Sequence, residues 1–155
     1  MSKGKKFENK ILNELNQLSK KGLCFFIKSP TPIRTIPTSE GYKMVYSEKA
    51  LCDFLGIWNG KFVIIEAKEI SGQRFDFKRL KDHQVKQLSS IKRHGGFAYI
   101  FFNVKKFNEI LVCKIEDYLI HLNQTNKKSI NIDALREISI CLDKGIEDLF
   151  NQLVN

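Results

Sequence analysis

Two carboxylates and one ammonium group are brought within reach of one another by the spacing of residues 52–68. Asp53 begins a first apolar run, Glu66 and Lys68 close a second one, and an Asn-Gly dipeptide separates the two runs. Because Asn-Gly favours both central positions of a two-residue type I′ turn, the stretch predicts a β-hairpin. In that register Asp53 lies opposite Glu66. Lys68 points to the same side of the sheet because it is two residues further along the strand.

Charges in this arrangement predict a metal site. Two facing carboxylates repel each other, and burying them is unfavourable unless a partner neutralises them. A hard divalent cation such as Mg²⁺ prefers oxygen ligands, commonly uses one or two carboxylates, and would remove that cost. The order Asp53, Glu66, Lys68 has the form D…E-x-K, which resembles the active-site pattern of PD-(D/E)xK nucleases. The alternative is a simple salt bridge of Lys68 at the end of a sheet.

Both faces of the predicted hairpin are apolar apart from these charges. We therefore expect the hairpin to lie inside a sheet that is covered on each side. Alternation along the two strands assigns the side chains to two faces. One face carries Asp53, Leu55, Ile57, Phe62, Ile64, Glu66 and Lys68, and the other carries Cys52, Phe54, Trp58, Val63, Ile65 and Ala67.

Two predicted helices bring further polar groups toward the hairpin. Residues 5–21 carry an apolar stripe, and Glu8 falls inside that stripe at about 100° per residue. Glu8 is either a residue that interacts with the helix N-terminus or an acid that points into the same site. Residues 82–94 form a second helix, in which Gln84 lies one turn before Leu88 and so leans toward the core and the site.

Basic and hydroxyl groups flank the site in the sequence. One group lies on a stiff, proline-containing segment at residues 28–35, which offers phosphate contacts or serves as a rigid connector. The other group, within residues 69–81, is interleaved with aromatic residues and forms either a solvated loop or an edge that grips a DNA strand. The candidate DNA-binding residues are Lys28, Thr31, Arg34, Arg74, Lys78, Arg79 and Lys81.

Length and composition limit the class of protein. A chain of 155 residues corresponds to about one domain, and we expect residues 1–155 to form a single one. Its 26 Lys and Arg against 17 Asp and Glu give a net charge of +9, which suits a polyanionic partner. The longest apolar run is too short to span a membrane. Four isolated cysteines without C-x-x-C spacing indicate reduced residues of a cytoplasmic protein.

The order of the predicted elements indicates an α/β fold. A helix, a strand, a projecting hairpin around residues 37–51, the central hairpin, a helix, two strands and closing helices follow one another. The continuous apolar run of residues 97–104 predicts a fully buried strand. This order fits a mixed β-sheet with helices on both faces.

The chain resembles the RecU family of Holliday junction resolvases, which belong to the restriction-endonuclease-like superfamily. The resemblance covers nearly the whole chain and rests on several blocks in order. The blocks are residues 4–8 with Ile11 and Asn13, Lys28-Ser29-Pro30-Thr31-Pro32-Ile33, Asp53-Phe54-Leu55-Gly56, Glu66-Ala67-Lys68-Glu69, Phe75, His83-Gln84, and Gly96 before residues 97–102. Two departures stand out. Leu51 and Cys52 replace the hydroxyl residues that usually precede the aspartate, and residues 37–51 form a shorter segment than the family's projecting stalk.

The resemblance implies a Mg²⁺-dependent endonuclease, with Mn²⁺ as a substitute, that resolves four-way DNA junctions in recombination and repair as a homodimer. It implies that Asp53, Glu66 and the carbonyl oxygen of Ala67 hold the metal, and that Lys68 orients the nucleophilic water. Glu8 and Gln84 complete the catalytic set. A bacterial or phage-encoded protein of the cytoplasm, associated with the nucleoid and not with a membrane, fits this activity.

Two other functions remain compatible with the sequence. Another PD-(D/E)xK nuclease would cut flaps, ends or specific duplex sites, and a panel of such DNA forms would distinguish it from a junction resolvase. A non-catalytic protein that binds branched DNA would keep the basic face. It would not need the three residues Asp53, Glu66 and Lys68 to be intact.

Overall fold

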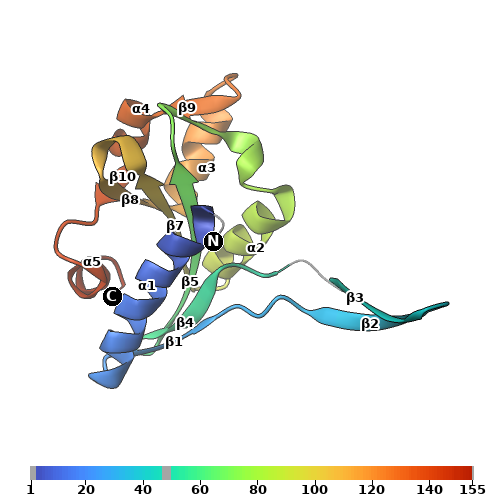
Figure 1. Cartoon of the computed structure of the whole chain (residues 1–155). Helices are drawn as coiled ribbons and strands as arrows, with labels where there is room; N and C mark the ends of the chain where they lie inside the picture. Colours follow the sequence, from blue (N-terminus) through green and yellow to red (C-terminus); the bar gives the residue numbers. More distant parts are fainter. Residues whose placement is uncertain (1–2, 47–49, 155) are drawn as a thin grey trace.

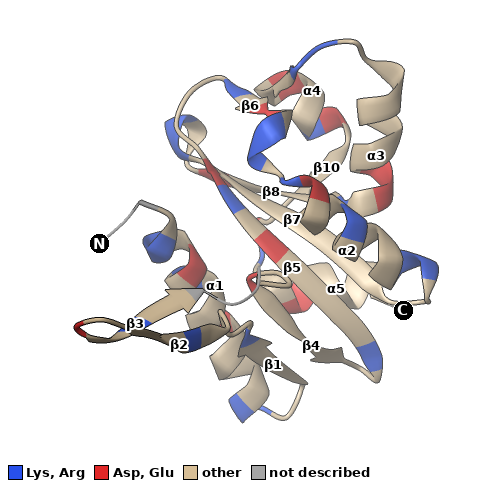
Figure 2. Cartoon of the chain, turned by 90° about the vertical axis from the view of Figure 1, so that its right-hand side faces the viewer, with Lys and Arg blue, Asp and Glu red and all other residues tan. Residues whose placement is uncertain are grey.

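The computed structural model describes residues 3–46 and 50–154 of the chain. They form a six-stranded sheet with helices on both faces and a small separate hairpin (Figures 1 and 2). The strand order is β1-β4-β5-β7-β8-β10, with β5 and β7 parallel and the other neighbours antiparallel. The mixed α/β sheet expected from the sequence is therefore confirmed.

The elements alternate along the chain much as the hydrophobic pattern predicts, with three short strands in addition. The helices are α1 (Lys3–Lys20), α2 (Asp82–Arg93), α3 (Ile115–Gln124), α4 (Ile132–Glu137) and α5 (Ile146–Leu153), with the 3-10 turns η1 (Phe77–Arg79) and η2 (Lys105–Phe107). The strands are β1 (Cys24–Lys28), β2 (Ile33–Thr38), β3 (Gly41–Tyr46), β4 (Phe54–Trp58), β5 (Lys61–Ile70), β6 (Arg74–Asp76), β7 (Phe97–Val104), β8 (Glu109–Lys114), β9 (Ser129–Asn131) and β10 (Ser139–Cys141).

The central hairpin β4–β5 has the register that its turn predicts. Trp58 faces Lys61 and Phe54 faces Ile65. The two residues of the Asn-Gly turn have φ angles of 46° and 74°, the left-handed conformation that a type I′ turn requires. This register carries the residues just beyond the strand pair to the same end of the sheet, where the candidate site lies.

Strand β1 joins the hairpin on its other side and brings Lys28 opposite Phe54. A glycine makes this approach possible. A Cβ atom at Gly56 would lie 2.1 Å from the carbonyl oxygen of Phe25, far inside van der Waals contact. A larger residue at this position would push β1, and with it Lys28, away from the sheet.

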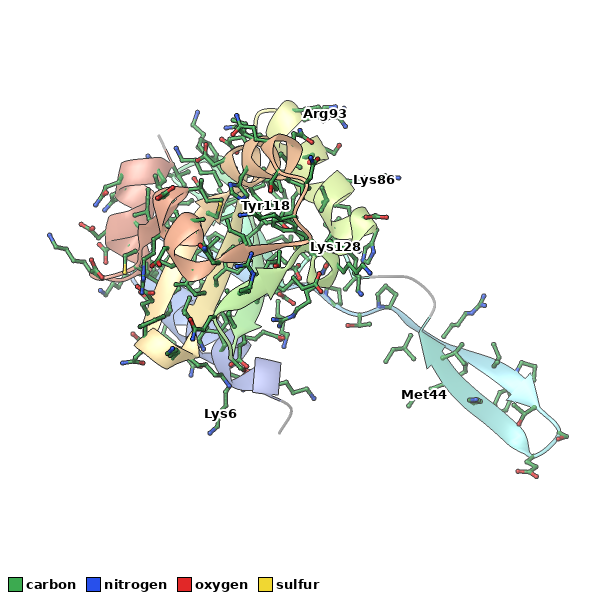
Figure 3. All side chains as sticks on the ribbon, turned by 90° about the horizontal axis from the view of Figure 1, so that it is seen from above. Lys6, Met44, Lys86, Arg93, Tyr118 and Lys128 are labelled. Atoms are coloured by element: carbon green, nitrogen blue, oxygen red, sulfur yellow. The ribbon has the colours of Figure 1, made fainter. Side chains whose placement is uncertain are left out.

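The hairpin β2–β3 forms its own two-stranded sheet and projects away from the body (Figures 1 and 3). It begins at Ile33, so the projecting hairpin predicted around residues 37–51 starts too late, and Ile33 pairs with Tyr46, the last described residue of β3. Pro37 lies inside β2, opposite Tyr42, because a strand with no further neighbour tolerates the missing N–H of proline. Residues 47–49 of the predicted hairpin lie outside the described residues, and Leu51 follows it.

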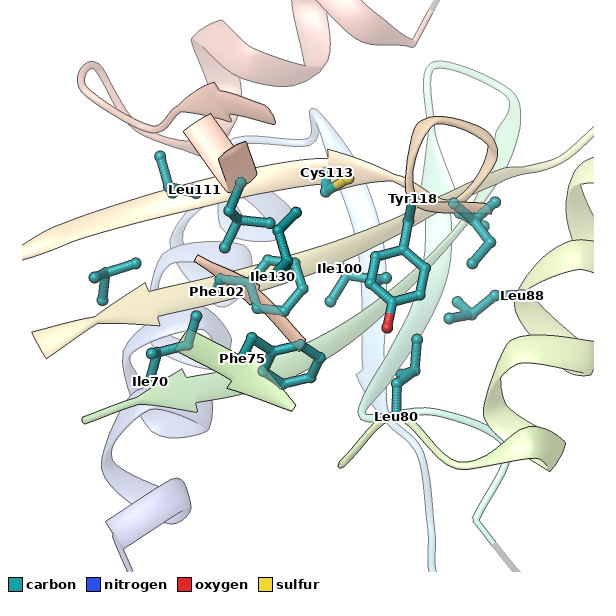
Figure 4. Packing of buried hydrophobic residues seen from close by; sticks show 14 of the residues in the cluster. Ile70, Phe75, Leu80, Leu88, Ile100, Phe102, Leu111, Cys113, Tyr118 and Ile130 are labelled. Carbon is teal, nitrogen blue, oxygen red and sulfur yellow. The ribbon is translucent and has the colours of Figure 1, made fainter. Parts of the chain in front are cut away.

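The main sheet separates two apolar cores. On one face, α1 and α5 cover Phe54, Val63 and Tyr99. On the other face, α2, α3 and α4 cover residues such as Ile100 and Phe102 of β7, and Tyr118 and Leu88 close this core from the helix side (Figure 4). Alternate residues of β5 and β7 enter opposite cores, and the two strands are therefore buried on both faces as their continuous apolar runs predict.

Cys52 does not lie on the face that alternation predicts for it. It packs in the core under α2 and α3, whereas Phe54 packs in the core under α1. The regular strand begins only at Phe54, and just before it the Asp53 N–H donates to the Ile65 carbonyl oxygen over 3.2 Å. Residue 52 therefore precedes the pleated part of the chain, and the period of two does not extend to it.

The expectation that the hairpin is covered on each side is wrong near the turn. Phe25, Ile57 and Phe62 face one another across β1, β4 and β5, and they are 64%, 48% and 36% exposed. Leu23 and Ile27 of the same edge are also exposed. The helices α2 and α3 pack against β7 and β8 and leave this corner bare. We call these five residues the apolar edge patch.

Candidate active site

The candidate catalytic charges meet at the end of the central hairpin. Asp53 directly precedes β4, and Glu66, Ala67 and Lys68 belong to the second half of β5. The Glu66 side chain is 3% exposed, and its Oε1 lies 2.8 Å from Lys68 Nζ. The Ala67 N–H donates to Asp53 Oδ2 over 2.7 Å. The Lys68 salt bridge that the sequence suggested as an alternative to a metal site is therefore present, with Glu66 as its partner. It coexists with the pair of carboxylates, Asp53 and Glu66.

Helix α2 contributes Gln84, which links the two charged groups of β5. Its Nε2 donates to Glu66 Oε1 over 2.6 Å, and its Oε1 accepts from Lys68 Nζ over 3.3 Å. The same Oε1 accepts from the Lys81 N–H at the start of the helix, over 3.0 Å. Because Gln84 is held from both sides, it fixes Lys68 and Glu66 relative to each other, as its predicted position on the helix suggested.

Helix α1 brings Glu8 close enough to Asp53 for its charge to act on that carboxylate. Its Oε2 lies 2.7 Å from Nζ of Lys28, the last residue of β1. Burial raises the pKa of Asp53, and the hydrogen bond from Ala67 opposes that change. The charge of Glu8 raises the pKa further, whereas Lys68 and Lys28 lower it. Glu8 thus acts on the site through its charge, and its own closest partner is a lysine.

The buried position of Glu66 determines its protonation. Burial, followed by the charge of Asp53, raises the pKa of Glu66 to about 7, against the opposing effects of Lys68 and Gln84. Both carboxylates of the pair are therefore harder to ionise than in water. A nearby positive charge would therefore favour the ionised form of both carboxylates.

The donor set fits a hard divalent cation. The hydrogen bonds described above use Asp53 Oδ2 and Glu66 Oε1, so each carboxylate has a second oxygen to offer. Within residues 3–46 and 50–154 no three His, Cys, Asp or Glu side chains converge as a metal-binding group. A third protein ligand would accordingly come from the backbone, as expected for the Ala67 carbonyl oxygen.

The other candidate DNA-binding residues divide into two sets. Thr31, Arg34, Lys78 and Lys81 are exposed, and Figure 2 shows basic segments on α2 and near β6 beside the acidic segment of β5. Thr31 lies on the connector before β2, and Arg34 lies on β2. Lys78 and Lys81 lie just before α2, the helix that carries Gln84, and the contacts of all four residues with DNA stay a prediction.

Arg74 and Arg79 serve the fold as well. Of the two predictions for residues 69–81, the solvated loop is wrong for residues 74–79, which form β6, paired with β9, and η1. The edge that grips a DNA strand stays a prediction. Arg74 Nε donates to Ser129 Oγ over 2.8 Å. Arg79 Nη2 donates to the Glu69 carbonyl oxygen over 2.7 Å, and its guanidinium lies 5.3 Å from the Phe75 ring centre. Partners far along the chain were not visible in the local pattern.

Two residues that support the site, Ser29 and Glu69, are not among the site residues predicted from the sequence. The Ser29 N–H donates to the Asp53 carbonyl oxygen over 2.8 Å and so ties the segment after β1 to the site. The Glu69 carboxylate lies 3.2 Å from Lys105 Nζ and accepts from Asn103. Both residues stand in the sequence blocks that carry the family resemblance, next to Lys28 and Lys68, but those blocks do not reveal what they contact.

Comparisons with known proteins identify the family of this chain. A family described as RecU, Recombination protein U, matches residues 2–153. The chain belongs to the RecU family. The Holliday junction resolvase RecU of Mycoplasmopsis pulmonis (strain UAB CTIP) is 27% identical over 138 residues, which cover 88% of this chain and 83% of that protein. The RecU of Geobacillus sp. (strain WCH70) is 27% identical over 108 residues, covering 64% of this chain and about half, 54%, of its own length.

A solved structure has the same fold as this RecU-family chain. It is Archaeoglobus fulgidus Hjc, a Holliday junction resolvase from an archaeal hyperthermophile. The match has a TM-score of 0.56 and 15% sequence identity, and it covers 97% of each chain. At this identity the likeness concerns the fold alone. The expected restriction-endonuclease-like sheet flanked by helices is thereby confirmed.

Proposed function

We propose that this RecU-family chain is an endonuclease that resolves four-way (Holliday) DNA junctions in recombination and repair, acting as one nuclease domain over residues 1–155. The observation that carries the proposal is the convergence of Asp53, Glu66, Lys68 and Gln84 at one end of the central hairpin. The Holliday junction resolvases among its relatives supply the substrate class. The chain would work on DNA in the cytoplasm of a bacterium, whether encoded by the bacterium or by a phage.

The residues that would hold a divalent cation are Asp53 and Glu66 with the carbonyl oxygen of Ala67. When bound, Mg²⁺, or Mn²⁺ in its place, supplies a water of lowered pKa and positive charge beside the scissile phosphate. A cation at this position would favour the ionised form of Glu66 and so offset the burial that raises its pKa.

The other site residues act on the phosphate and the attacking water. Lys68 places an ammonium group beside the buried Glu66, where it would stabilise the negative charge that grows on the phosphate during attack. Gln84 holds both groups in place through its two hydrogen bonds. Glu8 adds negative charge near Asp53, and Lys28 balances it.

DNA would be held by basic groups around the site. The net charge of +9 gives the chain a general attraction to the phosphate backbone. Lys28, Thr31, Arg34, Lys78 and Lys81 are the exposed candidates for phosphate contacts. Arg74 and Arg79 contribute to the same surface while also bonding Ser129 and Glu69.

The apolar edge patch would join two copies of the chain. Phe25, Ile57 and Phe62 form a continuous exposed row, and a second copy would remove it from water. A two-fold dimer would present two sites to the two-fold symmetric junction. The projecting hairpin β2–β3, with its exposed Tyr42 and Met44, would enter the branch point, as the family resemblance implies.

The decisive test is cleavage of a labelled four-way junction, in parallel with flap and linear duplex DNA. We expect cutting of the junction in Mg²⁺ and Mn²⁺ and none after EDTA treatment. Preferred cutting of flaps or duplexes would favour another nuclease of the superfamily. Tight binding to the junction without any cutting in either metal would favour a non-catalytic DNA-binding protein.

The dimer is tested separately by light scattering, which should give about twice the chain mass of 18.0 kDa. Phe25→Glu should yield the monomer, because a charge in the row opposes its burial. The matched control is Ile140→Glu, which introduces the same charge at a partly exposed residue of the opposite edge strand, β10. A wild-type protein that stays monomeric with junction bound would contradict this part of the proposal.

A further inference from the structure

An open groove of about 630 Å³ lies beside the candidate active site, between η1, the first turns of α2, and α3. Its volume is in the range of sites that accept a small ligand or a few side chains. The active-site residues do not line it. The groove is lined by Phe77, Lys78, Leu80, Lys81, Asp82, Val85, Lys86, Tyr118 and Leu122.

The floor of the groove is apolar and part of the fold. Leu80 and Tyr118 are 3% and 1% exposed and belong to the core under α2 and α3 (Figure 4). Val85 and Leu122 pack against that core from a half-buried position. Phe77 meets Tyr118 edge-on, with ring centres 5.9 Å apart. A floor anchored in this way exists before any partner arrives, so binding does not have to order it.

The rim of the groove is basic. Lys78, Lys81 and Lys86 are exposed, and Asp82 is the one acid among the lining residues. In the described part of the chain none of these three lysines forms a salt bridge with a carboxylate, unlike Lys28, which is paired. The rim therefore offers an excess of positive charge around an apolar floor.

We propose that this groove binds a short acidic segment of a partner protein that carries one bulky apolar side chain. The apolar side chain would occupy the floor over Leu80 and Leu122, where burial supplies most of the affinity. The acidic residues would lie along Lys78, Lys81 and Lys86, where opposite charge steers the segment and fixes its direction. Charge complementarity and the preformed floor together select this kind of partner.

A nucleobase fits the floor less well. Bases bind by stacking on an exposed ring face and by hydrogen bonds to their edges. Leu80, Val85 and Leu122 offer neither, and the ring of Tyr118 is almost entirely buried. The ring of the half-buried Phe77 is already in edge-on contact with the rings of Tyr118 and His121. DNA backbone alone has no group that would use an apolar floor.

The groove and the active site meet at the start of α2 but use different groups of the chain. The Lys81 N–H donates to Gln84, which holds Glu66 and Lys68, whereas the Lys81 side chain belongs to the rim. Lys78 and Lys81 are also candidate DNA contacts. Lys86 and Leu122 belong to the groove alone, so variants at these two positions report on it separately.

The test uses the full chain and fluorescence anisotropy of a labelled short peptide of aspartates and glutamates that carries one phenylalanine. We expect a Kd on the order of 10 µM at low salt. Two altered probes check the chemistry. Replacing the phenylalanine by serine removes the apolar anchor, and replacing the acids by amides removes the charge, so each should weaken binding roughly tenfold or more.

Two variants of the protein, each with a matched control, locate the site. Lys86→Glu should weaken peptide binding roughly tenfold, whereas Lys144→Glu, the same change at an exposed lysine that does not line the groove, should leave it within about twofold. Leu122→Ser should weaken binding by about five- to tenfold, whereas Ile120→Ser, on a more exposed part of the same helix, should not. Circular dichroism confirms that each variant is folded.

The inference is overturned if the peptide does not bind, or if the groove variants and their controls behave alike. It is also overturned if a short single-stranded oligothymidine binds more tightly than the peptide and depends on Leu122, which would indicate a base site. The inference stands apart from the proposed nuclease function. Asp53→Asn should abolish cutting and keep peptide binding, and Lys86→Glu should keep cutting and lose peptide binding.

Discussion

The two β-hairpins of this chain differ in what surrounds them. Each is an antiparallel pair closed by a tight turn, and they follow each other in the sequence. In β4–β5, Phe54 and Ile65 are completely buried. In β2–β3, Tyr42 is 82% exposed and Met44 is 71% exposed (Figure 3). Both hairpins have antiparallel backbone pairing, but the rest of the fold buries β4–β5 and leaves β2–β3 exposed to solvent.

The buried hairpin β4–β5 is suited to catalysis, and the exposed hairpin β2–β3 is suited to recognition of a partner. Buried surroundings raise the pKa of Glu66 and Asp53 and hold Lys68 against Gln84, so the end of β4–β5 is suited to a cation and a phosphate. The β2–β3 hairpin projects from the body and exposes large side chains on a frame of backbone hydrogen bonds, which suits contact with a partner of matching shape. Each of the following four predictions tests one side of this contrast.

The largest effect is expected for Asp53→Asn, which removes one charge from the proposed cation site and keeps the side-chain shape. Cleavage of a four-way junction should fall by roughly a thousandfold or more, because the cation binds weakly and the water it would activate stays at its bulk acidity. Affinity for the junction and the fold should be unchanged. The matched control is Glu137→Gln, the same type of change at an exposed acid at the end of α4.

The measurement for this first prediction is a single-turnover cleavage assay alongside a gel-shift assay and a thermal melt. Cleavage by Asp53→Asn at near the wild-type rate would show that the facing carboxylates do not form the catalytic site. Loss of the fold would show that Asp53 is a structural residue. Glu137→Gln should cut normally.

The second prediction concerns stability and pH in metal-free protein. Glu66 has a folded-state pKa of about 7, raised from 4.5, so its ionisation opposes folding. Its contribution to stability is complete below pH 4.5 and is lost as the pH rises through about 7. The free energy of unfolding of the wild type should therefore drop relative to Glu66→Gln between pH 4.5 and 8, by on the order of 1–3 kcal/mol.

Urea unfolding in EDTA at several pH values measures this difference. Asp53, whose pKa is raised too, is present in both proteins and lowers the stability of both as the pH rises, so the comparison isolates the contribution of Glu66. Parallel stability curves for wild type and Glu66→Gln would contradict the buried, cation-free carboxylate pair. Mg²⁺ should restore stability to the wild type above pH 7 and leave Glu66→Gln nearly unchanged.

The third prediction tests Gln84 as the residue that positions Lys68 and Glu66. Gln84→Met keeps the length of the side chain but removes its hydrogen bonds. Cleavage should fall roughly 10- to 100-fold, with junction affinity retained. The control is Gln87→Met, three residues further along α2. Gln87 Oε1 is buried without a hydrogen-bond partner in the described residues, so losing it should not slow cleavage. Equal effects of both variants on cleavage would mean that helix α2 is simply disturbed.

The smallest effect is expected on the exposed hairpin. Tyr42→Ala combined with Met44→Ala should weaken binding to a four-way junction by roughly three- to tenfold, and binding to linear duplex less, because only the branch point would contact the hairpin. The melting temperature should not change, since both side chains are exposed. Gel shifts with the two DNA forms measure the loss of affinity for the junction relative to the loss for linear duplex. An equal loss on both DNA forms would assign the hairpin to general DNA contact.

Local sequence determined the frame of the site. The Asn-Gly turn and two apolar runs determined the register of β4–β5, and that register alone placed Asp53 and Glu66 at one end of the hairpin. The apolar stripe of α1 placed Glu8 toward the sheet. These results follow from short-range preferences, because turn conformation and the period of a helix or strand depend on residues a few positions apart.

Only the tertiary structure decided which groups meet across long stretches of chain. Glu8 pairs with Lys28, and Arg74 bonds Ser129, 55 positions away, in a β6–β9 pairing that no local pattern indicated. The bare corner at Phe25 also depends on where α2 and α3 pack. Contacts of this kind depend on how whole elements dock, and many partners are equally compatible with one exposed charge or one apolar side chain in the sequence.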